Sequence, residues 1–312
     1  MNSEATMESP VVPGHRGTVF DIGYQRYEGI REGRSRSRAA IYKDGFRTAL
    51  GLGRGGRAKI LPWFFLAILT LLGLIMAIVA GAANQFGGQG TAEQMNLPSH
   101  SDFFGIASIA LFVFASVVAP ELLCPDKRNG VINLYLVRPL TGTDYVVPRW
   151  AAFLTVMLMA TCFPQFILFL GLSMGDAVPL DYLKEHWLDV PKFMLSGLVI
   201  SAYLTSLAML TASFTTRRAY ASVFLVGLFI ISTPFTMGVS QEIDGPLGQW
   251  ISMFTLSNIP IHVNDIIFQT ASEITEEAPA RALGSTMLVA WYFLWTGGAA
   301  ALLWWRYRRL TP

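Results

Sequence analysis

Six separate runs of apolar residues constrain the fold of this chain more than any other feature of its sequence. They lie at about 62–83, 103–120, 147–172, 191–214, 219–240 and 286–305. A helix needs roughly 20 residues to cross the hydrocarbon core of a bilayer, and it satisfies its own backbone hydrogen bonds there. The runs therefore predict an all-α polytopic membrane protein with six transmembrane helices.

The composition agrees with this class. Of the 312 residues, 53% are hydrophobic and 14% are charged, and the mean hydropathy is +0.45. The net charge of +2 is too small to indicate a nucleic-acid partner, so the placement of the charges matters more than their sum. The two cysteines, Cys124 and Cys162, lie outside the expected external loops, so no disulfide framework is indicated.

The distribution of basic residues predicts the orientation of the spans. If both termini lie on one side, all but three of the 23 Lys and Arg residues lie on that side, and the three others are Lys184, Lys192 and Arg281. Short loops rich in Lys and Arg stay in the cytoplasm during insertion. We therefore expect a multi-pass protein of the cytoplasmic membrane with its N and C termini in the cytoplasm.

The first segment, residues 1–37, is rich in Gly, Ser, Arg and Glu, which predicts a mobile cytoplasmic extension. Within it, TVFDIGYQRYEGIREGR has three aromatic residues, Phe20, Tyr24 and Tyr27, among charged ones. Two interpretations stay open for this island. It is either part of a disordered basic tail or a docked segment that packs its aromatic rings beneath the membrane domain.

Residues 38–60 come next and precede the first span. Ile41, Phe46 and Leu50 recur near helical spacing, while charged residues fall on the other side. This pattern predicts an amphipathic helix in the membrane interface, followed by a basic hinge that anionic headgroups would attract. A calmodulin-type or nucleic-acid-binding patch is the alternative.

Three connections are expected on the external side, at 84–102, 173–190 and 241–285. The third is longer, is half apolar and contains Pro246 and Pro260. It predicts one or two short helices on or dipping into the outer leaflet, with an ordinary surface loop as the alternative.

The segment from Pro120 to Trp150 is a polar stretch between the second and third apolar runs. Its sequence is PELLCPDKRNGVINLYLVRPLTGTDYVVPRW. Glycine and proline residues punctuate it, which favours a compact bent loop. In its middle, VINLYL has the apolar positions of a short amphipathic helix that could face a partner or the membrane.

This segment resembles the coupling loop of ABC-2-type permeases, the membrane subunits of one class of ATP-driven exporters. The shared features are an acid at the end of a membrane helix, then K-R-x-G, a short apolar helix and R-P-L-T. The layout of residues 38–312 is also similar. It would comprise an interfacial helix, a six-helix transmembrane domain at 61–312, a cytoplasmic coupling loop at 120–150 and an external capping loop at 241–285.

In that family the coupling loop docks into a groove on a separate ATPase subunit. The resemblance assigns this contact to the following positions: Glu121, Asp126, Lys127, Arg128, Gly130, Leu134, Arg138 and Pro139. One departure is Pro148-Arg149, where relatives often have Gly-Lys just before the third span. The cationic role could pass to Arg149.

The resemblance implies a permease that moves its substrate by alternating access and is not itself an enzyme. Six spans make half of such a transporter, so the expected partners are two ABC ATPase subunits, a second permease copy or paralogue, and the lipid bilayer. No cofactor is expected on this chain, because ATP and Mg would bind the ATPase. Consistently, GLGRGGRAK at 51–59 lacks the G-K-[ST] of a phosphate-binding loop.

The interiors of the six runs contain essentially no ionisable residue, whereas proton- or sodium-driven carriers and intramembrane hydrolases normally need them. Gln165 is the most conspicuous polar residue deep in a span; it would either line a substrate path or form a hydrogen bond between helices. The four histidines do not have metal-ligand spacing, so no metal site is expected.

Other classes of function stay open. A membrane-embedded lipid- or isoprenoid-modifying enzyme would need clustered Asp or His at a membrane face, and Glu273, Glu276 and Glu277 are the only candidates. A secondary carrier and a structural or assembly protein are the further alternatives. Drug, lipid, peptide and glycan cargo all stay open as substrates, because apolar spans suit each of them.

Overall fold

The structure is a computed structural model that describes residues 33–53, 55–88, 90–95, 97–136, 140–175, 178–243, 245–270 and 275–309. In these ranges all regular secondary structure is helical. Six of the helices are long and apolar enough to cross a membrane, which confirms the expected fold class. They are α2 (Gly56–Gly87), α4 (His100–Arg128), α6 (Gly142–Gly175), α8 (Asp189–Ser213), α9 (Arg218–Glu242) and α12 (Ser285–Arg308).

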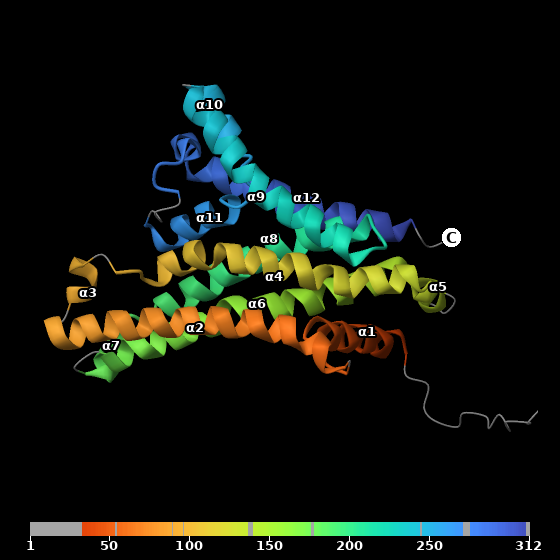
Figure 1. Ribbon diagram of the computed structural model, residues 1–312, viewed down its shortest axis with the longest axis horizontal. Helices are drawn as coiled ribbons and strands as arrows, with labels where there is room; N and C mark the ends of the chain where they lie inside the picture. The colour runs from red at the N-terminus through yellow and green to blue at the C-terminus, as the bar shows by residue number, and fades with distance from the viewer. Residues whose placement is uncertain are drawn as a thin grey trace, which may run out of the picture. The chain divides into compact units, whose positions relative to one another are not determined.

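Shorter helices lie at the ends of these six. At one end of the bundle are α3 (Thr91–Gln94) and α7 (Pro179–Glu185), and at the opposite end are α1 (Arg34–Ala49) and α5 (Val131–Leu136) (Figure 1). We call these the α7 end and the α5 end. The connection between α9 and α12 contains α10 (Pro246–Ser252), α11 (Ile259–Phe268) and the 3₁₀ helix η1 (Pro279–Leu283). This agrees with the short helices expected within 241–285.

Helix α6 is the centre of the packing, since it contacts α1, α2, α4, α8 and α12. Its crossing with α2 is close because glycines leave the backbones in contact: Gly73 faces Pro164, Gly171 faces Ala77, and Gly175 faces Gly81. Small residues permit such approaches between membrane helices. Helices α9 and α12 bury much less of their length in the protein, as expected of spans that face lipid or another subunit.

The stretch expected as a polar loop at 120–150 is mostly helical. Helix α4 continues through Pro120 and Pro125 to Arg128, and α6 already begins at Gly142. The 34 residues of α6 would extend about 51 Å, whereas the hydrocarbon core is about 30 Å thick. Both helices therefore continue beyond the apolar core, and the connection between them is reduced to α5 and the residues flanking it.

Helix α1 also differs from expectation. It begins at Arg34 rather than Arg38, and its buried residues are Ile41, Gly45 and Ala49. The helix packs extensively on α6, where Gly45 adjoins Ala152. At these positions the apolar stripe therefore faces protein and not lipid. The aromatic island at 18–34 lies almost entirely outside the described residues.

Candidate functional site

Helix α5 lies at the end of the bundle, where α4 reverses direction into α6. After α4 ends at Arg128, Gly130 adopts a positive φ of 66°, which favours glycine. Arg128, Asn129 and Gly130 are exposed, and Ile132 is buried in the core. Of the other predicted coupling positions, Leu134 lies in α5 but its side chain is outside the described part of the structure, as are Arg138 and Pro139.

Asp126, near the end of α4, belongs to an ionic cluster around the buried Arg149. It accepts hydrogen bonds from Arg149 Nη2 at 2.9 Å and from the Tyr145 hydroxyl at 2.7 Å, both on α6. Arg149 is 2% exposed and also pairs with Asp44 of α1 at 2.8 Å. Because burying a charge without partners costs several kcal/mol, this cluster fixes α1, α4 and α6 relative to one another.

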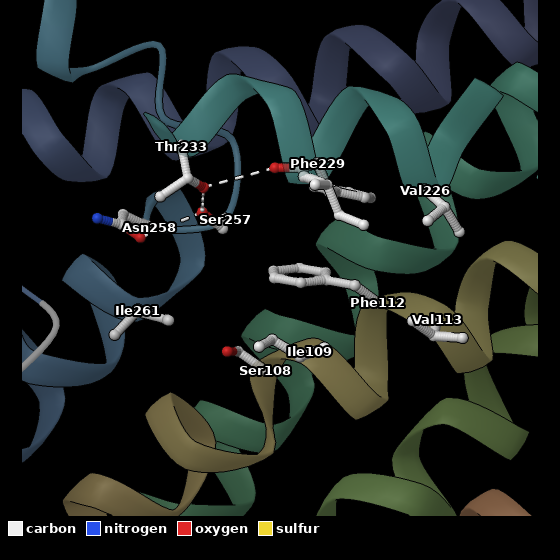
Figure 2. A pocket seen from close by; sticks show the side chains of 11 residues that line it. Ser108, Ile109, Phe112, Val113, Val226, Phe229, Thr233, Ser257, Asn258 and Ile261 are labelled. Atoms are coloured by element: carbon white, nitrogen blue, oxygen red, sulfur yellow. Dashed lines mark hydrogen bonds between the residues drawn. The ribbon is translucent and has the colours of Figure 1, made fainter. Parts of the chain in front are cut away.

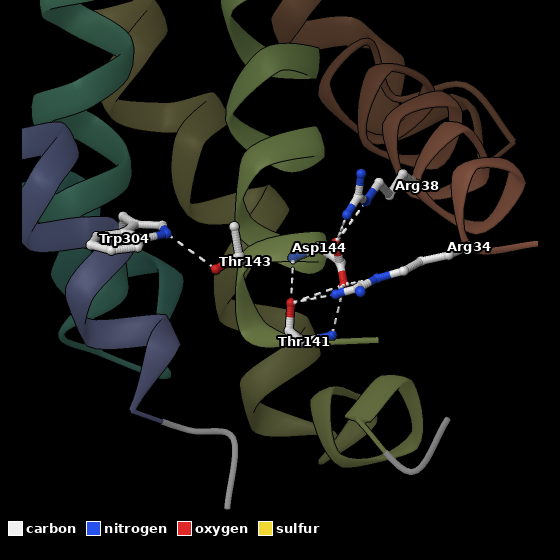
Figure 3. Close-up of polar contacts among 6 residues, drawn as sticks. All are labelled: Arg34, Arg38, Thr141, Thr143, Asp144 and Trp304. Atoms are coloured by element: carbon white, nitrogen blue, oxygen red, sulfur yellow. Dashed lines mark hydrogen bonds and ion pairs between the residues drawn. The ribbon is translucent and has the colours of Figure 1, made fainter. Parts of the chain in front are cut away.

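A second ionic cluster joins α1 to the first turn of α6 (Figure 3). The buried carboxylate of Asp144 accepts hydrogen bonds from Arg34 Nε and Arg38 Nε, each at 2.6 Å. The Thr141 backbone N–H also donates to Asp144 at 2.9 Å. Sequence reasoning did not single out Asp144, although Thr141 and Asp144 have the spacing of a capping box at a helix start. The spacing does not reveal Arg34 and Arg38, because they are distant in the sequence.

Two more of the predicted coupling residues have partners within the chain. Glu121 accepts from Arg218 Nη1, at 2.5 Å and 2.6 Å to its two oxygens, which links α4 to α9. Lys127 donates to the backbone carbonyl of Ser213, the last residue of α8, and Arg306 Nε donates to the same carbonyl at 3.1 Å. Cations at a helix C-terminus are stabilised by its unpaired carbonyls and by the helix dipole.

The predicted coupling residues therefore separate into two groups. Glu121, Asp126 and Lys127 contact α9, α6 and α8 respectively, whereas Arg128 and Gly130 face outward. Among the described members, the outward group is exposed, and the inward group connects α4 to three other spans. Beside them, burial raises the pKa of the Tyr135 phenol, so this ring is neutral at physiological pH.

A cavity of about 390 Å³ lies between α4, α9 and the segment leading into α11 (Figure 2). Its walls are mostly apolar along α4 and α9, where Phe112 and Phe229 stack with ring centroids 4.3 Å apart. At one side the wall is polar, because Thr233 and Ser257 share a hydrogen bond of 2.7 Å and Ser257 donates to Asn258 at 3.2 Å. We call it the α4–α9 cavity.

Gln165 is not one of the described residues that line this cavity. It is fully buried and links α6 to the first residue of α4, His100. Its Nε2 donates to the His100 backbone carbonyl at 3.0 Å, and its Oε1 lies 2.6 Å from His100 Nδ1. The hydrogen bond between helices, one of the two roles expected for Gln165, is therefore present.

The comparisons with known proteins add no family to this description. Neither a scan against models of protein families nor a search among curated proteins finds a match for this chain.

Proposed function

We propose that this chain is the permease subunit of an ATP-driven ABC-2-type exporter in the cytoplasmic membrane, with both termini in the cytoplasm. The observation that supports the proposal is the construction of the α5 end. A short helix joins two long spans there, Arg128 and Gly130 just before it are exposed, and nearby residues of α4 contact two further helices, α9 and α8. Such an arrangement suits a segment that an ATPase subunit binds and moves.

The contacts define a route for that force. A displacement of α5 pulls on the end of α4, where Asp126 binds α6, Glu121 binds α9 and Lys127 binds α8. In alternating access, ATP would close two ATPase subunits, and α5 of each permease would move with them. The contact of Asp126 with the buried Arg149 then carries this motion into α6, because a buried charge cannot leave its partner without a large penalty.

The α4–α9 cavity is the candidate substrate path in this scheme. It is formed by α4, which continues directly to the α5 end, and by α9, which Glu121 and Arg218 join to α4. A shift of α4 against α9 would change the cavity and its opening. Since the chain supplies six spans, half of an exporter, we include a second permease copy or paralogue in the complex.

The experiment is affinity purification of the tagged chain from its native membranes, followed by assay of Mg-dependent ATP hydrolysis. The wild-type preparation should hydrolyse ATP, and the activity should disappear when high salt strips the partner from the chain. Arg128→Glu combined with Val131→Asp should lower the co-purified activity at least about tenfold, because charges opposed or unpaired at a protein contact cost 2 kcal/mol or more.

The matched control reverses a charge at the opposite end of the bundle. Lys184→Glu on α7 changes an exposed residue whose partner is the exposed Asp181, and it should leave the ATPase bound. Full ATPase binding and transport by the α5 variant would contradict the proposal. A lipid- or isoprenoid-modifying enzyme and a secondary carrier, the alternatives, would both work in vesicles without any ATPase.

A further inference from the structure

A second cavity, of about 450 Å³, lies between helix α11, the 3₁₀ helix η1 and the start of α12. We call it the α11–α12 pocket. Its polar side chains are those of His262, Asp265, Gln269, Arg281 and Ser285. None of these residues lines the α4–α9 cavity or takes part in the contacts described at the α5 end.

His262 of α11 is buried in the wall of this pocket without a hydrogen-bond partner. It is 5% exposed, and neither ring nitrogen has a partner in the part of the chain that the structure describes. The nitrogens are not among the sealed side-chain atoms that lack a partner, so the pocket gives access to them. Burial, followed by the charge of Arg281, lowers the pKa of His262 to about 4. The ring is therefore neutral at physiological pH and has one N–H group to donate.

The N-terminus of α12 opens into the same pocket, where Gly284 and Ser285 form part of the wall. Gly284 is the N-cap, and no side chain caps this helix. The backbone N–H of Ser285, the first helical residue, has no acceptor among the described residues. The first N–H groups of a helix lack intrahelical acceptors and carry the positive end of its dipole, so they favour an anion.

Arg281 of η1 adds a full positive charge beside these donors. Its Nη1 lies 3.8 Å from Asp265 Oδ2, which is too long for a hydrogen bond, and its side chain is 38% exposed. Asp265 is 4% exposed, and the Thr275 hydroxyl donates to its carboxylate. The protein therefore holds the carboxylate in place, while the guanidinium can still turn its N–H groups toward a ligand.

We propose that the α11–α12 pocket binds a singly charged phosphate group, the phosphodiester that a phospholipid headgroup carries. His262, Arg281 and the Ser285 backbone N–H would each donate to it. Arginine and helix N-termini both suit phosphate oxygens. The Asp265 carboxylate in the same wall would repel a second negative charge, which favours a diester over a doubly charged monoester. The inference does not depend on ATP-driven export.

The position of the pocket favours a lipid as the source of the phosphate. Ser285 is the first residue of α12, one of the six candidate membrane spans. The pocket therefore lies where a span begins, at the depth of the headgroups. A metal ion is disfavoured, because the described residues contain no group of three His, Cys, Asp or Glu side chains that could hold one.

The test uses the purified full chain in a maltoside detergent, which contains no phosphate. Phosphatidylglycerol, or diacylglycerol with the same acyl chains, is added, and native mass spectrometry counts the lipid retained. Phosphatidylglycerol should be retained about tenfold more strongly, which corresponds to about one charge-assisted hydrogen bond. Arg281→Met, His262→Phe and Ser285→Pro should each remove most of this preference, because each deletes one donor.

Two of these variants have a matched control. Ser285→Ala keeps the backbone N–H that Ser285→Pro removes, and proline is well accommodated at the first position of a helix after an extended residue such as Gly284, whose ψ is 156°. Arg217→Met removes an exposed arginine at the start of another span, α9. Both control variants should retain the preference.

Arg281→Met keeps the proposal testable if His262→Phe does not fold, since the Arg281 side chain is partly exposed. Basic residues elsewhere also attract phosphatidylglycerol, so the loss of preference in the pocket variants is the decisive quantity. Equal retention of the two lipids by the wild type overturns the proposal. A preference that is unchanged in all three pocket variants overturns it as well.

A titration with dimethyl phosphate, the smallest phosphodiester, identifies the source of the ligand. It is added to the chain in the same detergent, and binding is measured by calorimetry. Saturable binding that Arg281→Met removes supports the proposal and shows that a soluble phosphodiester also fits the pocket. Retention of phosphatidylglycerol without binding of dimethyl phosphate supports the same chemistry and assigns it to a membrane lipid.

Discussion

The two ends of the helical bundle contain different kinds of buried polar group. At the α5 end, the buried groups are charged, and their partners come from other helices, as with Asp126 and Arg149 or Asp144 and Arg34. At the α7 end, the buried pair is an imidazole and an amide, His100 and Gln165, and Nε2 of His100 has no hydrogen-bond partner among the described residues. Both pairs join helices, and both leave a buried nitrogen without a partner among the described residues, since Arg149 Nε and Nη1 also have none.

The physical reason is the different cost of the two patterns. A buried ion pair is strongly destabilised when one partner is removed, so it resists separation of the helices that carry it. A neutral imidazole with one unused lone pair costs far less, because only one hydrogen bond is missing. The charged contacts at the α5 end should therefore resist separation of their helices more strongly than the neutral contact at the α7 end.

The largest expected effect breaks the α5 end. Asp126→Ala removes the partner of Arg149 and of the Tyr145 hydroxyl, and it should lower the free energy of unfolding by about 3 to 5 kcal/mol. Glu121→Ala, which removes a partly exposed carboxylate of the same helix from its pair with Arg218, should cost about 1 kcal/mol or less. Denaturant unfolding in detergent measures both, and equal costs would show that burial of the pair is unimportant.

A buried neutral histidine makes the stability of the chain depend on pH. His262 of α11 is buried, and burial, followed by the positive charge of Arg281, lowers its pKa from 6.5 to about 4. Between these two values the unfolded chain binds a proton that the folded chain does not. Stability should therefore fall by about 3 kcal/mol as the pH drops from 6.5 through 4, and the loss from this residue should level off below pH 4.

His262→Asn is the control for this pH dependence. The variant keeps Asp265 and Arg281, which line one pocket together with His262. It should remove most of the loss of stability between pH 6.5 and 4. Thermal melting of both proteins across the pH range measures the difference. Identical pH profiles would mean that His262 is not neutral in the folded chain at these pH values.

The smallest effect tests the neutral contact at the α7 end. Gln165→Leu leaves the His100 Nδ1–H and the His100 carbonyl without their partner and should cost about 2 kcal/mol. Combining it with His100→Phe removes the stranded ring donor too, so the double variant should be more stable than Gln165→Leu alone. If the double variant loses as much stability as the two single variants together, the two side chains are not in direct contact.

The sequence was a good guide to the spans and a poor guide to their ends. Pro120 and the charges after it suggested that the second span stops there, yet α4 continues to Arg128. Proline removes one backbone donor, but neighbouring helices can compensate for it in a membrane protein. The helix continues because Glu121, Asp126 and Lys127 find partners on other helices, and hydropathy does not register such partners.

By itself, the sequence determined the all-helical class, the six apolar spans and the presence of short helices between α9 and α12. These are local properties, because the length and hydropathy of each run decide whether it can cross a bilayer. Only the tertiary structure decided which charges meet. Asp144 and Arg34 are 110 positions apart, and they come together because α1 packs along α6. The free nitrogen of His100 is likewise a product of packing, since the position of Gln165 determines which ring nitrogen stays open.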